Sequence, residues 1–113
     1  MAALPRSYSR YTLEALRLLG KEIELTRKSK KITAAALSER CGISRVTLRK
    51  IERGETATEI GAVFEAAAIV GIRLFDAENT QALHTAFLHA SDKAALLPQR
   101  VRLKRMKASD NDF

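Results

Sequence analysis

The chain has a single cysteine, Cys41, two histidines and no tryptophan among its 113 residues. One cysteine cannot form an internal disulfide and cannot supply a cysteine-based zinc site. His84 and His89 lie five residues apart, so a helix does not bring them together as it would a chelating pair four residues apart. We therefore expect no metal and no cofactor.

A long hydrophobic run is also missing. The longest nearly apolar stretch, Ile60 to Ile72, is interrupted by Glu65 and is much shorter than the roughly 20 residues of a membrane-spanning helix. The first residues, MAALPRSYSRY, contain no apolar block of the kind found in signal peptides. These absences predict a cytoplasmic protein without a membrane partner.

Motifs of catalysis are absent as well. The sequence has no Gly-rich phosphate loop, no nucleophile beside a histidine and no clustered carboxylates. Glu22 and Glu24 stand beside cationic residues in a helical pattern, and we interpret them as solvated helix charges. The chain is therefore not expected to be an enzyme.

What the sequence does have is positive charge, with 20 Lys and Arg against 13 Asp and Glu and a formal net charge of +7. The charge is uneven, since residues 1–53 carry +8, residues 54–99 carry −4 and residues 100–113 carry +3. Clustered cations make favourable contacts with phosphates, so the first half is expected to face a polyanion. A solvated basic face without any partner is the alternative.

Hydrophobic spacing predicts four helices and no strand in the first 75 residues. The helices are expected over residues 12–28, 34–41, 45–53 and 58–70. Three of them have a hydroxyl residue suited to accept a backbone N–H at the helix start, namely Thr33, Ser44 and Thr58. Glycines follow the last three helices where a left-handed residue is favoured, at Gly42, Gly54 and Gly71.

The same pattern predicts the core. Apolar side chains are expected to fill the wedge between the second and third helices: Leu37, Cys41, Ile43, Leu48 and Ile51. Cys41 is interpreted as a small buried hydrophobe and not as a reactive thiol. The fourth helix is expected to cover the first three with Ile60, Val63, Phe64, Ala67 and Ala68.

Beyond residue 75 a second helical pattern begins. Apolar residues recur at spacings of four and three as an a/d seam before Pro98, at Leu83, Phe87, Ala90, Ala94 and Leu97. The seam predicts a dimer interface, with folding back onto the same chain as the alternative. The predicted organisation is an arm (residues 1–11), a compact domain (12–75), a dimerisation helix (76–98) and a basic tail (99–113). Alternating residues in the tail allow a short strand before a disordered end.

The segment GISRVTLRKIERG, with the preceding AAALSERC, resembles the helix-turn-helix of the Xre, or Cro/C1-type, repressor family. The positions that carry the resemblance are Leu37, Gly42, Ile43, Ser44, Leu48, Ile51, Glu52 and Gly54. The resemblance implies an all-α, lambda-repressor-like domain of four to five helices, here followed by a helical extension and a basic tail. It also implies a sequence-specific repressor that binds a palindromic DNA operator as a dimer.

The resemblance assigns roles to individual side chains. Arg45, Val46 and Lys50 occupy positions that read base edges, where cations donate to guanine and an apolar group contacts the thymine methyl. Residues expected near phosphates are Lys30, Lys31, Thr33, Ser44, Thr47 and Arg49. Two positions depart from the family, because Ala34 replaces a frequent phosphate-binding Gln and Lys31 replaces a frequent Gly. Phosphate anchoring is therefore expected to rely on Lys28, Lys30 and Lys31.

Arg27 and Glu52 occupy two family positions that often pair as a structural salt bridge between the first and third helices. We carry this pair over as a prediction about the fold and not about DNA contact.

The size and the ending ALLPQRVRLKRM also look like antitoxin-repressors of the HipB type. That narrower resemblance implies control of the chain's own operon and neutralisation of a HipA-like kinase toxin. A plain Xre-family regulator without a toxin is the nearest alternative. A coactivator or RNA-binding adaptor with the same fold is a third, and it predicts weak discrimination among duplex sequences.

Overall fold

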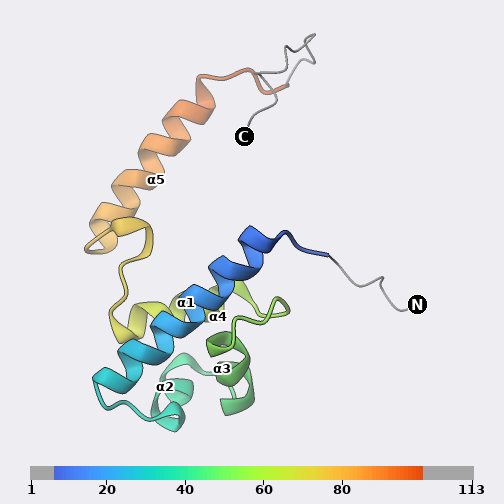
Figure 1. Ribbon diagram of the computed structural model, residues 1–113. Helices are drawn as coiled ribbons and strands as arrows, with labels where there is room; N and C mark the ends of the chain where they lie inside the picture. Colours follow the sequence, from blue (N-terminus) through green and yellow to red (C-terminus); the bar gives the residue numbers. More distant parts are fainter. Residues whose placement is uncertain (1–6, 101–113) are drawn as a thin grey trace. The chain divides into compact units, whose positions relative to one another are not determined.

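The computed structural model describes residues 7–100 and divides the chain into two compact units, one ending at Asp76 and one starting at Ala77 (Figure 1). The first unit contains α1 (Arg10–Ser29), α2 (Ala34–Cys41), α3 (Arg45–Glu52), α4 (Ile60–Val70) and a short 3-10 turn, η1 (Leu74–Asp76). The second unit contains α5 (Thr80–Ala95). Residues 7–100 hold no strand, so the all-α prediction is confirmed.

Side-chain hydroxyls begin the first three helices. The Thr33 hydroxyl accepts the backbone N–H of Ala36, and the Ser44 hydroxyl accepts that of Thr47, each at 3.0 Å. These are the two N-caps predicted from the sequence, and each satisfies a donor that the helix leaves free. α1 starts two residues earlier than predicted because Ser9 caps it in the same way.

α4 begins differently from the prediction. Its N-cap is Glu59, which makes no side-chain capping bond, so the expected cap at Thr58 is wrong. The Thr58 hydroxyl instead donates to the Glu55 carbonyl in the turn that follows α3. The carboxyl end of α4 is as predicted, since Gly71 adopts the left-handed conformation with φ of 98°.

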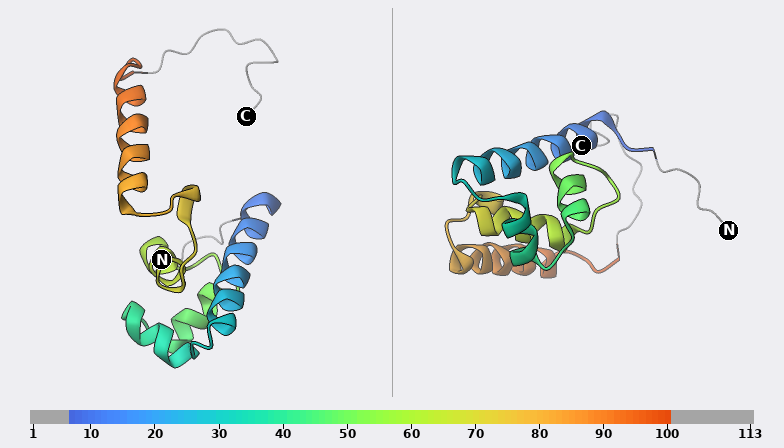
Figure 2. Two further views of the ribbon diagram at one scale, coloured as in Figure 1. Left: turned by 90° about the vertical axis from the view of Figure 1, so that its left-hand side faces the viewer. Right: turned by 90° about the horizontal axis from the view of Figure 1, so that it is seen from below.

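The core of the first unit lies where these helices meet. α2 packs against α3 and α4, while α1 packs against the same two helices from another side (Figure 2). The buried hydrophobic residues are Ile23, Leu37, Leu48, Ile51, Val63, Ala66, Ala67 and Val70. Cys41 and Ile43 are half-buried at the edge of this core.

Two residues predicted for the core are exposed. Ile60 stands at the first position of α4, and Ala68 lies on its outer side. The buried face of α4 follows the helical period through Val63, Ala67 and Val70 instead. The expected core positions Ile60 and Ala68 were therefore wrong.

A close approach of α1 to α3 depends on Gly20. A β-carbon at this position would lie 2.7 Å from the Glu52 carbonyl oxygen, much closer than side chains and backbone approach in proteins. The glycine therefore lets α1 lie directly on the carboxyl-terminal turn of α3. This contact sets the distance between the two helices that carry most of the basic side chains described below.

The second unit has no buried core among the described residues. α5 is capped by the Asn79 side chain, which accepts the Ala82 N–H at 2.9 Å, but none of its residues is buried. The helix ends at Ala95, so the last position of the predicted seam, Leu97, lies outside it. The helix ends before Pro98 because the helical conformation is disfavoured for the residue that precedes a proline, here Leu97. The strand considered for the tail lies outside the described residues.

Candidate nucleic-acid interface

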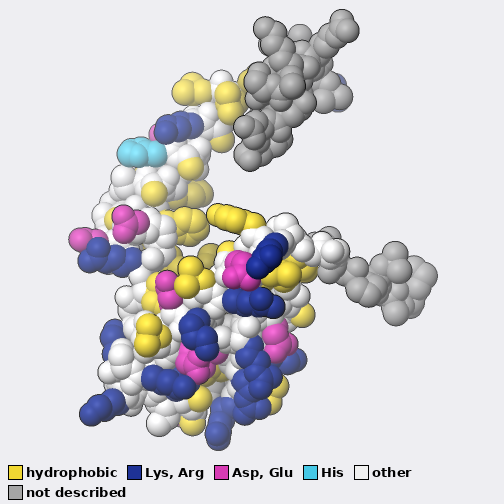
Figure 3. Space-filling view, in the orientation of Figure 1, with side chains coloured by type: hydrophobic (Ala, Val, Ile, Leu, Met, Phe, Trp, Pro, Cys, Tyr) yellow, Lys and Arg dark blue, Asp and Glu magenta, His cyan; other side chains and the backbone are white. Residues whose placement is uncertain are grey.

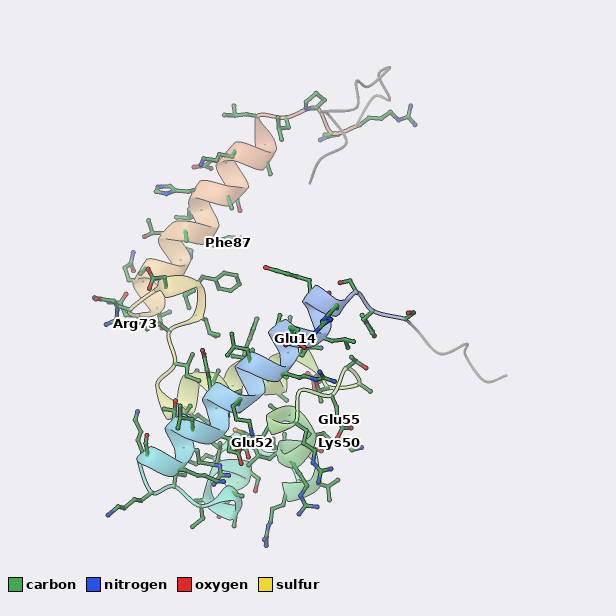
Figure 4. All side chains as sticks on the ribbon, in the orientation of Figure 1. Glu14, Lys50, Glu52, Glu55, Arg73 and Phe87 are labelled. Atoms are coloured by element: carbon green, nitrogen blue, oxygen red, sulfur yellow. The ribbon has the colours of Figure 1, made fainter. Side chains whose placement is uncertain are left out.

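α3 presents one apolar and one cationic side. Leu48 and Ile51 are 1% and 2% exposed in the core, whereas four side chains on the rest of the helix are exposed: Arg45, Val46, Arg49 and Lys50. The three predicted base-reading residues therefore all lie on the open side, and Figure 4 shows Lys50 pointing away from the core. The cations among them form no ion pair within residues 7–100. They are free to donate to an external acceptor.

The turn between α2 and α3 brings further polar groups to the same region. Ser44 is exposed and its hydroxyl donates to the Thr47 hydroxyl at 3.0 Å, while also capping α3. Thr33 caps α2 in the same way. Both hydroxyls are thus engaged structurally, and each oxygen still has a lone pair with which to accept another hydrogen bond.

The two lysines predicted to contact phosphate differ in their surroundings. The Lys30 ammonium donates to the Val70 carbonyl at the carboxyl end of α4, where a positive charge is favourable to the helix dipole. Lys31 is exposed, with φ of 59° in the left-handed region that favours glycine. Lys31 is therefore available to a ligand, whereas Lys30 must first leave Val70.

Arg27 and Glu52 form a two-point salt bridge between α1 and α3. The Arg27 Nε donates to Glu52 Oε2 at 2.8 Å, and Nη2 donates to Oε1 at 3.0 Å. A third donor of Arg27, Nη1, bonds the Ile32 carbonyl at 3.0 Å. The hydrogen bonding of Arg27 to the Glu52 carboxylate raises the pKa of Arg27 above its ordinary value. Both side chains are about nine-tenths buried, so the pair locks α1 onto α3.

Glu24 is more than a solvated helix charge. Its carboxylate accepts Lys21 at 2.8 Å and Lys28 at 2.9 Å on the same side of α1. These two hydrogen bonds lower the pKa of Glu24 to about 2, and the Lys21 pKa is raised in return. The interpretation of Glu24 as an ordinary solvated charge was therefore incomplete, because it shares its carboxylate between Lys21 and Lys28, two lysines whose side chains are themselves exposed.

An open groove of about 650 Å³ lies between α1 and α3, and we call it the α1–α3 groove. Leu48, Ala34 and two carboxylates, Glu24 and Glu52, contribute to its lining. Its cations are Arg17, Lys21, Arg27, Arg45, Arg49 and Arg53. In Figure 3 the basic side chains gather over this part of the molecule, with acidic ones between them.

Three of these cations were missed from the sequence: Arg17, Lys21 and Arg53. The spacing of four between Arg17 and Lys21, and between Arg49 and Arg53, was readable as one side of a helix. The sequence does not show that this side of α1 and this side of α3 face the same groove.

The one cysteine of the chain, Cys41, lies half-buried against the core. Burial raises the pKa of the Cys41 thiol, with a smaller contribution from Glu65, which disfavours the reactive thiolate. Residues 7–100 contain no group of His, Cys, Asp and Glu able to hold a metal ion. No helix in that range is both long and apolar enough to cross a membrane.

Comparison with known proteins agrees with this geometry. Residues 23–76 match the family model described as a helix-turn-helix, so the match covers α2, α3, α4 and the end of α1. No curated protein matches the chain. Residues 23–76 are thus a Cro/C1-type (Xre) helix-turn-helix domain, a DNA-binding domain typical of non-enzymatic regulators.

Proposed function

We propose that the protein is a transcriptional repressor that reads a specific duplex DNA sequence with α3 and binds a palindromic operator as a dimer. The single observation that supports it most is the surface of α3. Arg45, Val46 and Lys50 are exposed, while Leu48 and Ile51 anchor the helix in the core. An exposed helix with this chemistry fits the major groove, where arginine and lysine donate to guanine and valine contacts the thymine methyl.

The salt bridge between α1 and α3 supports the same function. A reading helix discriminates between bases only if its orientation is held, because a tilt moves donors away from base edges. The bond of Arg27 to Glu52 and the close approach at Gly20 fasten the carboxyl end of α3 to α1. The amino end is held by the cap at Ser44.

The dimer is proposed from the second unit. α5 carries exposed apolar side chains without any buried residue, including Leu83 at 37% and Phe87 at 63% exposure. A second copy of α5 would cover the seam formed by Leu83, Phe87, Ala90 and Ala94. A two-fold pair of reading helices would then match two halves of a palindrome, which a single helix contacting a few base pairs cannot do.

The test compares binding to the DNA upstream of the chain's own gene with binding to random duplex of equal length. Arg45→Ala and Lys50→Ala are expected to remove about 1–3 kcal/mol of preference for the upstream DNA. Lys31→Ala, at a proposed phosphate contact, is the matched control and should weaken both duplexes equally. Equal loss on both duplexes for all three variants would contradict base reading by α3. It would favour the adaptor alternative.

The HipB-like antitoxin role and its HipA-like kinase partner stay a narrower hypothesis. The resemblance rests on the tail, most of which lies outside the described residues. Co-purification with the product of the neighbouring open reading frame tests it. A neighbour that is neither a kinase nor toxic removes this role and leaves the repressor proposal intact.

A further inference from the structure

We propose that the α1–α3 groove binds the phosphate backbone of DNA, so that α1 contributes Arg17 and Lys21 to the interface. This inference rests on the proposed function and extends it to a second helix. It adds three cations, with Arg53, that neither the sequence pattern nor the family match assigns to DNA. Its basis is the charge, spacing and position of the side chains in the groove.

The charge in the groove is not neutralised by its own carboxylates. Glu52 is fully engaged by Arg27, and Glu24 is shared between Lys21 and Lys28. Arg45 and Arg49 have no carboxylate partner within residues 7–100. Arg53 reaches Glu55 only at 4.0 Å, and Arg17 pairs at 3.3 Å with Glu14, which does not line the groove and is exposed. Six cations against two carboxylates leave a strongly positive hollow, which concentrates anions because its low-dielectric walls focus the field.

The cations are arranged in rows. Arg45 and Arg49 are four residues apart on α3, and Arg53 follows four residues later as its carboxyl-terminal cap. Arg17 and Lys21 are four apart on α1. Four residues advance a helix by about 6 Å, so each wall presents its charges one turn after another. A compact anion would contact only one or two of them. A row favours an extended polyanion, and a sugar-phosphate strand is one.

The position of the groove beside α3 favours DNA as this polyanion. Arg45 and Arg49 lie in the groove and also on the exposed side of α3. The groove lining also includes Ala34, the first residue of α2, and the free N–H groups at the start of a helix favour phosphate. A strand in the groove would therefore be the backbone beside the bases that α3 contacts. The buried Arg27–Glu52 pair and Leu48 form a fixed floor beneath it.

The test is a salt titration of DNA binding by the full chain. Arg17→Ala and Lys21→Ala change side chains that are 65% and 71% exposed, so the fold should persist, which circular dichroism checks. Log K falls as log salt rises, and each variant is expected to make this negative slope shallower by about 0.9. Each variant should also weaken binding to the upstream and random duplexes by the same factor. Lys93→Ala, which removes the same charge from α5, is the control and should leave the slope unchanged.

Three results distinguish a failure of the groove inference from a failure of the proposed function. An unchanged slope in both variants, with the preference for upstream DNA retained, overturns the groove and leaves the proposed function standing. A wild-type chain without any preference overturns the proposed function, while a reduced slope in the variants still supports the groove. Binding of inorganic tripolyphosphate that requires Arg17 and Lys21, together with an unchanged DNA slope, makes the groove a small-anion site and overturns the inference.

Discussion

The two units are built from the same kind of element, an amphipathic helix, with opposite outcomes. In the first unit four helices bury Ile23, Leu37, Leu48 and Val70 at 1% exposure or less. In the second unit α5, 16 residues long, buries nothing. Forming the first turn of a helix costs more than its hydrogen bonds return, so most of the stability of a helix in a protein comes from packing of its apolar side. The first unit is thus stabilised by its own packing, whereas α5 has no buried side chain to stabilise it in the same way.

The two units also differ in how their charged side chains are paired. The first unit combines basic side chains on its surface with one ion pair, Arg27–Glu52, that is about nine-tenths buried. Buried pairs hold a defined geometry, while exposed ones contribute little. α5 has no ion pair of either kind in the described residues. Precise geometry is therefore built into the DNA-binding unit and not into the helix beyond it.

The largest expected effect compares the same substitution in both units. Leu48→Ala is expected to destabilise the first unit by about 2–5 kcal/mol, because it leaves a cavity in the core. Leu88→Ala changes a side chain that is 45% exposed on α5 and should cost less than about 0.5 kcal/mol. Urea denaturation measures both. Equal losses would contradict the contrast between a packed and an unpacked unit.

The next effect concerns the buried ion pair. Glu52→Ala leaves Arg27 buried without its carboxylate and is expected to cost about 3 kcal/mol of unfolding free energy. Glu55→Ala, which removes an exposed partner of Arg53 at 4.0 Å, is the matched control and should cost almost nothing. Thermal unfolding followed by circular dichroism compares the two. A stable Glu52→Ala variant would show that the pair does not hold α1 on α3.

A third substitution tests whether a second copy supplies the partner that α5 lacks. Phe87→Asp is expected to weaken dimerisation by about 2 kcal/mol, roughly 30-fold, since burial of a large apolar side chain is lost. Tyr11→Asp changes a large hydrophobic side chain of α1 that is 85% exposed, and it serves as the control. Sedimentation velocity measures the dimer fraction. An unchanged dimer would place the interface away from the α5 seam.

The smallest expected effect lies at the one strained backbone position of the α1–α2 turn. Lys31→Gly is expected to stabilise the first unit by about 0.5–1 kcal/mol, because a left-handed residue with a β-carbon is disfavoured there. Lys31→Ala removes the same charge without relieving the backbone. Both variants should bind DNA more weakly by the same factor, and only the glycine variant should unfold at a higher urea concentration. Equal midpoints would show that the turn carries no strain.

Much of the first unit follows from residues close together in the chain. Thr33 and Ser44 cap α2 and α3, and Gly42 and Gly71 end α2 and α4, as the sequence predicts. Such signals act over three or four residues, so their outcome does not depend on the rest of the fold. The prediction failed at Thr58, because α4 begins one residue later with Glu59 at the cap position, and the Thr58 hydroxyl donates to the Glu55 carbonyl.

The open and buried sides of α3 were likewise determined by the sequence alone, because helical periodicity separates Leu48 and Ile51 from Arg45, Val46 and Lys50. Only the tertiary structure decided which other cations join them. Lys30 bonds Val70, 40 residues away, and Arg17 and Lys21 meet Arg49 and Arg53 across the α1–α3 groove. These encounters depend on how helices pack, which is set by Gly20, the core and the Arg27–Glu52 pair together. Periodicity determines which side of each helix is open, and packing determines what that side faces.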